Sequence, residues 1–134
     1  PAPPNSAARS VNSTFSNYTT LELVRKSASL DHGIWTTNMY PPEKISPSGN
    51  EPTVAKWESE SEGFMTGTEG NVVYGLPDEQ TTVTLTWDNP YVGKNSYNIE
   101  IIGPQAISYI VHHDNDSSDN AAVQFSIRRF IKFI

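Results

Sequence analysis

The stretch Trp57–Tyr97 reads WESESEGFMTGTEGNVVYGLPDEQTTVTLTWDNPYVGKNSY and carries the clearest secondary-structure signal of the chain. Within it, Val83, Leu85 and Trp87 alternate with threonines, which is the two-residue period of a β-strand with one buried and one solvated face. Residues 88–91, Asp-Asn-Pro-Tyr, predict a turn that places a carboxylate and an aromatic ring at the end of this strand. We therefore expect any binding chemistry near that strand end.

Similar alternating segments lie within this stretch and on both sides of it, separated by glycine and proline. Strands are predicted near residues 11–15, 21–23, 34–37, 57–61, 71–76, 97–101, 107–111 and 123–127. The first two are expected to form a hairpin, and the proline-rich residues 40–52 the longest loop. About eight or nine short strands without a helical period predict a single-domain, all-β antiparallel β-sandwich of two packed sheets. Residues 1–10, rich in proline and serine, are expected to form a mobile N-terminal arm, which leaves 11–134 as the domain.

Length and composition narrow the range of possible functions. A chain of 134 residues can bury a sizeable core as one domain. Its 15 acidic and 9 basic residues give a net charge of −6, which repels nucleic acid and anionic membranes at long range. The absence of cysteine excludes disulfides, thiol catalysis and zinc–thiolate sites. No apolar run is long enough to span a bilayer, so a membrane role is expected to be peripheral at first contact.

Two motifs carry a resemblance to a known family. The string Glu60–Gly70, ESEGFMTGTEG, is followed by WDNPY at residues 87–91 and by GKNSY at residues 93–97. Together they resemble the aegerolysin family and are most similar to its bacterial branch, which includes small insecticidal crystal proteins. The similarity covers the chain from about Ser10 to Phe130, although mushroom members have cysteine and tryptophan where this chain has Asn89 and Tyr91.

The resemblance implies a β-sandwich that binds a membrane lipid, either a sphingolipid, with or without sterol, or ceramide phosphoethanolamine. It also implies a possible pore-forming protein partner, for which this chain would be the targeting component of a two-component cytolysin. Such a protein is expected to be secreted or released and to act at the membrane of a target cell, although no signal peptide is visible.

The candidate lipid-binding residues combine aromatic and charged side chains; they are Trp35, Trp57, Glu69, Trp87, Asp88, Tyr91, Lys94 and Tyr97. Tryptophan and tyrosine favour membrane interfaces because the ring is apolar while its N–H or O–H stays hydrated. Core packing is the alternative for the tryptophans. Core packing is favoured for Trp87, which shares a face with Val83 and Leu85. For Trp35 and Trp57, lipid contact and core packing both remain open.

The charged candidates suit the two parts of a phospholipid head group. Asp88 and the faces of Tyr91 and Tyr97 can hold an ammonium group, and Lys94 can bind a phosphate. In the alternative reading Asp88 caps its own turn and Lys94 is solvated. Glu69 either accepts backbone N–H bonds in a turn or joins this site.

Neither catalysis nor metal binding is predicted. The acidic residues of the loop 112–120 lack the central glycine and closing glutamate of a calcium loop, and no nucleophile–base motif occurs. We expect a non-enzymatic binding protein without cofactors. A carbohydrate- or protein-binding β-sandwich without membrane activity is the alternative, with the aromatic side chains stacking on sugar rings.

Overall fold

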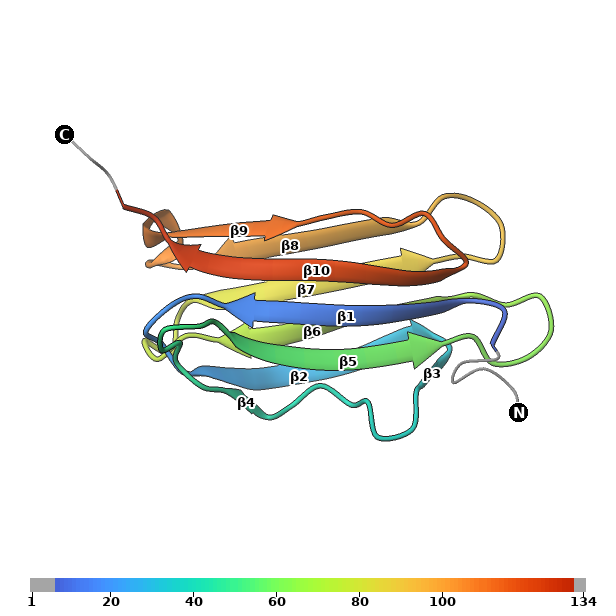
Figure 1. Cartoon of the computed structure of the whole chain (residues 1–134), viewed down its shortest axis with the longest axis horizontal. Coiled ribbons are helices and arrows are strands. Elements are labelled where there is room, and N and C mark those ends of the chain that lie inside the picture. Colours follow the sequence, from blue (N-terminus) through green and yellow to red (C-terminus); the bar gives the residue numbers. More distant parts are fainter. Residues whose placement is uncertain (1–6, 132–134) are drawn as a thin grey trace.

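The computed structural model describes residues 7–131, which fold into two packed β-sheets (Figure 1). The first sheet has the order β3 (Ile34–Trp35), β5 (Thr53–Glu60), β1 (Ser10–Asn17), β10 (Asn120–Arg129), β9 (Tyr109–His113). The second sheet has the order β4 (Lys44–Ile45), β2 (Leu23–His32), β6 (Thr68–Gly75), β7 (Thr82–Asn89), β8 (Ser96–Ile102). A 3-10 turn, η1 (Ala106–Ser108), precedes β9. The all-β sandwich is thus confirmed.

The strand pairing departs from the sequence prediction in two places. β1 and β2 lie in different sheets, so the expected hairpin between them is wrong. β1 instead pairs in parallel with β10 and antiparallel with β5, and the other ladders are antiparallel. Alternation along a segment identifies a strand and its buried face, but it does not specify the partner strand.

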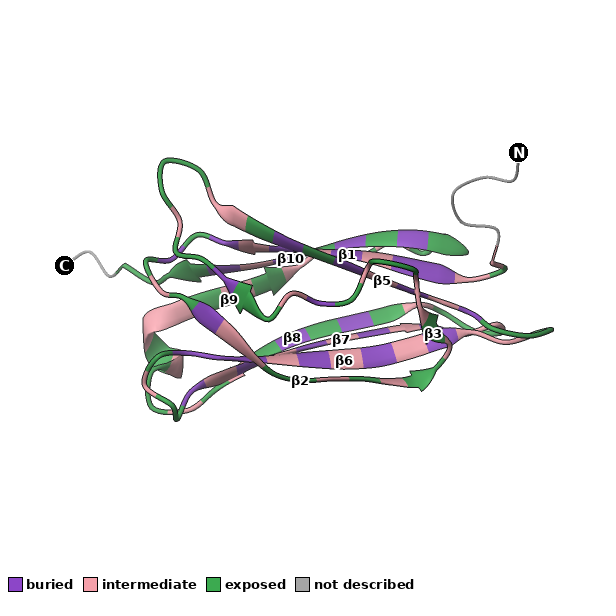
Figure 2. Ribbon diagram, turned by 90° about the horizontal axis from the view of Figure 1, so that it is seen from below, coloured by how far each residue is buried: buried purple, intermediate pink, exposed green. Residues whose placement is uncertain are grey.

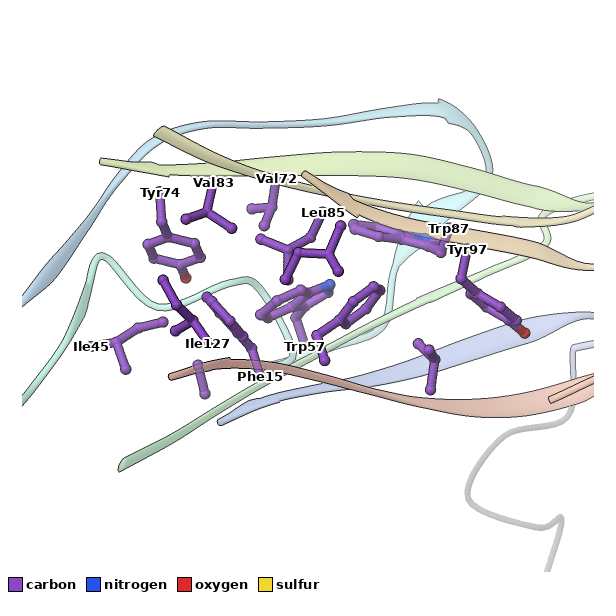
Figure 3. Close-up of a cluster of buried hydrophobic side chains, with 14 of the residues drawn as sticks. Phe15, Ile45, Trp57, Val72, Tyr74, Val83, Leu85, Trp87, Tyr97 and Ile127 are labelled. Atoms are coloured by element: carbon purple, nitrogen blue, oxygen red, sulfur yellow. The ribbon is translucent and has the colours of Figure 1, made fainter. Parts of the chain in front are cut away.

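The core lies between the sheets and is rich in aromatic rings. Buried and exposed residues alternate along the strands, as Figure 2 shows, so each sheet turns one face inward. Trp57 lies in the middle of this core, with its ring centroid 6.0 Å from that of Trp87 and 6.5 Å from those of Phe15 and Phe125 (Figure 3). Such packing holds the strand ends in fixed positions.

Two loops and the start of the described chain meet at one end of the sandwich (Figure 1). The loops are residues 61–67, between β5 and β6, and residues 90–95, between β7 and β8. Residues 1–6 of the expected N-terminal arm lie outside the described residues. Arg9 and Ser10 are described, and Ser10 already belongs to β1. The opposite end carries η1 and the last residues of β10.

Candidate functional site

Three titratable side chains lie in a row on the outer face of the second sheet. The register places Glu69 of β6 opposite His32 of β2 on one side and opposite Asp88 of β7 on the other. The Oε1 atom of Glu69 lies 3.8 Å from Nε2 of His32. Two carboxylates directly opposite each other on adjacent strands repel one another. This pair therefore favours a bound cation.

Asp88 lies in a setting that disfavours its charge. Burial raises the pKa of its carboxyl group above the ordinary value, and the nearby His32 lowers it by a smaller amount. The side-chain carboxylate of Asp88 accepts no hydrogen bond from a side chain or backbone N–H of residues 7–131, so it does not cap the predicted turn. The reason is that β7 extends through Asp88 and Asn89, where a turn was expected.

A groove of about 400 Å³ opens beside these carboxylates. We call it the acidic groove; it is lined by His32, Met65, Thr66, Gly67, Thr68, Glu69, Asp88, Pro90 and Tyr91. One wall depends on a glycine, because a Cβ atom at Gly67 would lie 2.5 Å from the carbonyl oxygen of Asn89. A second hollow of about 260 Å³ adjoins it and shares Glu69 and Asp88.

Arg9 fixes the other wall, which contains Tyr91. Its guanidinium group lies 4.7 Å from the centre of the Tyr91 ring and donates a hydrogen bond of 2.8 Å to the carbonyl oxygen of the same residue. A further bond of 3.4 Å reaches the carbonyl oxygen of Pro90, and Asp119 lies 3.6 Å away. The Tyr91 ring therefore lines the groove in a fixed position, with Arg9 over its face.

The buried Asn89 anchors the end of β7 to the first sheet. Its side-chain amide donates hydrogen bonds of 3.0 Å to the carbonyl oxygen of Ser10 and 2.8 Å to that of Asp119. Its side chain is almost fully buried, so these bonds are protected from water. The strand end that bears Asp88 is thereby held in place.

Three exposed apolar side chains, which we call the apolar tip, lie on the two loops at this end of the sandwich; they are Phe64, Met65 and Val92. Phe64 is 89% exposed, Val92 83% and Met65 56%. Met65 also lines the groove, and its φ of 57° is unusual for a residue other than glycine. Sequence reasoning missed the apolar tip and His32. The signal for the tip was an apolar pair, Phe-Met, inside a loop bounded by Gly63 and Gly67.

Two of the candidate tryptophans are core residues, in line with the reading favoured for Trp87 and against lipid contact by Trp57. Trp57 and Trp87 are buried in the core, so they cannot contact a lipid in this conformation. The indole N–H of Trp87 donates a 2.9 Å hydrogen bond to the hydroxyl of Ser59. Trp35 is half-buried at the edge of the first sheet, where its ring contacts Tyr40 and Trp87 at centroid distances of 5.2 and 5.9 Å.

Two further candidates, Lys94 and Tyr97, lie outside the acidic groove. Lys94 is exposed on the loop 90–95 but does not line the acidic groove. Tyr97 is 8% exposed, and its hydroxyl donates a 2.7 Å hydrogen bond to the carbonyl oxygen of Asp116. Burial raises the pKa of this phenol. Of the eight candidates, the acidic groove thus brings together Glu69, Asp88 and Tyr91.

Residues 7–131 lack two features that would suggest other functions. No group of three or more histidine, aspartate or glutamate side chains is placed to hold a metal ion in this part of the chain. Over the same residues, no helix is long and apolar enough to cross a membrane.

The fold and this end of the molecule define a β-sandwich with an acidic groove beside an exposed apolar tip. A family model described as Aegerolysin matches residues 11–128, so the chain belongs to the aegerolysin family. No curated protein matches the chain.

Two solved structures share the fold at low sequence identity. The crystal structure of the lipid binding protein Nakanori has a TM-score of 0.79 and 14% identity, over 92% of this chain and 73% of that one. The crystal structure of RahU protein in complex with a TRIS molecule has a TM-score of 0.67 and 16% identity, over 96% of this chain and 100% of that one.

Proposed function

We propose that this protein binds a membrane lipid without catalysing a reaction, and that the lipid carries a phosphoethanolamine or a sphingolipid-like head group. The observation that carries the proposal is the position of the apolar tip directly beside the acidic groove. Family membership and the fold shared with a lipid binding protein support it. In the bound state, the tip enters the interfacial region of the bilayer and the head group enters the groove.

The side chains of the groove favour a primary ammonium group. An ammonium group can donate hydrogen bonds to Glu69 and Asp88. A quaternary ammonium group has no such donors and depends on several aromatic faces. Among the described residues that line the acidic groove, the aromatic rings are the phenol of Tyr91 and the imidazole of His32, and Arg9 already lies over the Tyr91 ring. We therefore expect phosphoethanolamine to bind more tightly than phosphocholine.

The apolar tip supplies the larger share of the affinity in this proposal. Burying a side chain of the size of Phe64 contributes about 2 kcal/mol, and Met65 and Val92 add to this. An exposed ion pair between the ammonium group and a carboxylate contributes about 0.2–1 kcal/mol. The tip thus drives adsorption and the groove selects the head group. The net charge of −6 favours neutral or zwitterionic membranes over anionic ones.

We propose further that the bound protein is the targeting component of a pore-forming pair. Strands of 8 residues such as β5 separate the two ends of the sandwich by about 25 Å. With the apolar tip in the bilayer, the η1 end stays in water, where a second protein can reach it. The aegerolysin resemblance motivates this part of the proposal.

Co-sedimentation with vesicles tests the proposal. We expect binding to vesicles that contain ceramide phosphoethanolamine, weaker binding to those with sphingomyelin and sterol, and least to pure phosphatidylcholine. Failure to bind any of the three would refute lipid binding. With a dye trapped inside the vesicles, the chain alone should bind without releasing it. Release by the chain alone would refute the targeting role.

A further inference from the structure

A second groove lies on the outer face of the first sheet, across β1, β10 and β9. Its volume is about 210 Å³. β1 and β10 face the viewer in Figure 1, whereas the strands of the acidic groove, β6 and β7, lie behind them. Because the two grooves lie on opposite sheets, one can be occupied without the other.

Arg128 at one end of the second groove is held in place yet has unused donors. Its guanidinium carbon lies 4.3 Å from the centre of the Tyr18 ring. Within residues 7–131 the guanidinium makes neither a hydrogen bond nor an ion pair. Arg9 differs, because carbonyl oxygens accept its N–H groups. A planar fork of free N–H donors, already oriented by stacking, suits bidentate binding of a carboxylate or sulfate.

The other end of the second groove carries a carboxylate in place of a guanidinium group. Asp114 lines this end; one of its carboxylate oxygens accepts the backbone N–H of Gln124 at 2.8 Å, and the other has no hydrogen-bond partner within residues 7–131. The side-chain amide of Gln124 lines the same end, and His112, which lies opposite Ser126, lines the groove between the two ends. These groups accept and donate hydrogen bonds to hydroxyls, and the carboxylate repels a second anion.

Polar side chains elsewhere on this face bond to one another. The amide of Asn12 donates to Glu58 at 3.1 Å, and the hydroxyl of Thr36 donates to Glu60 at 2.7 Å. In the second groove, the hydroxyl group of Ser16 and the side-chain amide of Gln124 make no such bonds within residues 7–131. Unused hydrogen-bonding groups thus gather in a concave region next to an aromatic ring.

We infer that the second groove binds an acidic oligosaccharide. The carboxylate or sulfate of the sugar pairs with Arg128, and its hydroxyl groups bond to Asp114 and Gln124. Four residues along β10 separate Arg128 from Gln124, which is about 13 Å and exceeds one sugar ring. A small inorganic anion could use only the arginine end, and a neutral sugar would leave the guanidinium unused. The inference does not depend on lipid binding, because the acidic groove contributes none of these residues.

Titration of the isotope-labelled protein, followed by NMR, tests the inference. The probes are sialyllactose, sulfated lactose, neutral lactose and sodium sulfate. We expect saturable shifts of the amides of Tyr18, Gln124 and Arg128 with the two acidic sugars, and at least tenfold weaker binding of lactose and of sulfate. No saturable shifts, shifts centred elsewhere, or equal binding of lactose or sulfate would each overturn the inference.

Matched variants assign the binding to the groove. Arg128→Gln should weaken binding of the acidic sugars at least tenfold, whereas Arg129→Gln, which removes the same charge from an exposed residue outside the groove, should leave it unchanged. Equal losses in the two variants would show nonspecific charge attraction and overturn the assignment. Vesicle binding by Arg128→Gln should match that of the unaltered protein, which separates this inference from the proposed lipid site.

Discussion

Replacement of Phe64 by serine tests the membrane-docking end most directly. The side chain is 89% exposed, so it contributes little to folding and nearly all of its apolar surface is available to the bilayer. Loss of its transfer from water costs about 2 kcal/mol, which corresponds to about 30-fold weaker binding. The free energy of unfolding should change by no more than about 0.5 kcal/mol.

The assay is co-sedimentation with ceramide phosphoethanolamine vesicles over a range of lipid concentrations, with thermal unfolding measured in parallel. Ile107→Ser is the matched control, because Ile107 is 85% exposed but lies at the η1 end. Its binding should equal that of the unaltered protein. If Phe64→Ser binds as well as the unaltered protein, or if Ile107→Ser is equally impaired, the loop end is not the docking surface.

Three further predictions concern the groove and the core. Asp88→Asn should weaken binding to phosphoethanolamine vesicles several-fold. It should also raise thermal stability slightly, because it relieves the repulsion from Glu69, which is worth about 0.2–1 kcal/mol. Glu100→Gln, on the same outer face, is the control, and an equal loss of binding in that variant would contradict a specific role of Asp88. Vesicle binding should weaken on acidification at a pH above the usual range for aspartate, because burial raises the pKa of Asp88 and protonation removes its charge. Protonation also relieves an unfavourable buried charge. The contribution of Asp88 to folding stability is therefore greatest below its pKa in the unfolded chain and is lost as the pH rises through its pKa in the folded protein. Ser59→Ala should lower the free energy of unfolding by about 1–3 kcal/mol, because it leaves the buried indole N–H of Trp87 without its acceptor. Denaturant-induced unfolding measures this loss, and an unchanged denaturation midpoint would contradict the prediction.

Part of the candidate site was predictable from sequence. The sequence placed Asp88 at the end of its strand, although in a turn and not on the strand itself, and a place in this site was one of the two readings of Glu69 in the glycine-marked loop. The turn residue Tyr91 was also expected to be accessible. The role of His32 was not predictable, because it lies far away in sequence and joins the row only through the pairing of β2 with β6.

The tryptophans show the limit of sequence reasoning. Trp57 has the residue type of an interfacial anchor and its sequence left both readings open, whereas the face that Trp87 shares with Val83 and Leu85 already favoured the core. Their burial depends on which strand covers each face, and that in turn depends on the parallel pairing of β1 with β10 across more than 100 residues of chain. No local pattern encodes such a contact.

The sequence alone determined that the chain forms short, amphipathic strands, because alternation of apolar and polar side chains is a local property that each segment carries by itself. It also determined the absence of cysteine chemistry and the net negative charge. Only the tertiary structure decided which strands pair, and thereby which carboxylates face each other, which rings are buried and which loops meet at one end. These are properties of contacts between residues distant in sequence, and the free energy that selects them is that of packing the two sheets as a whole.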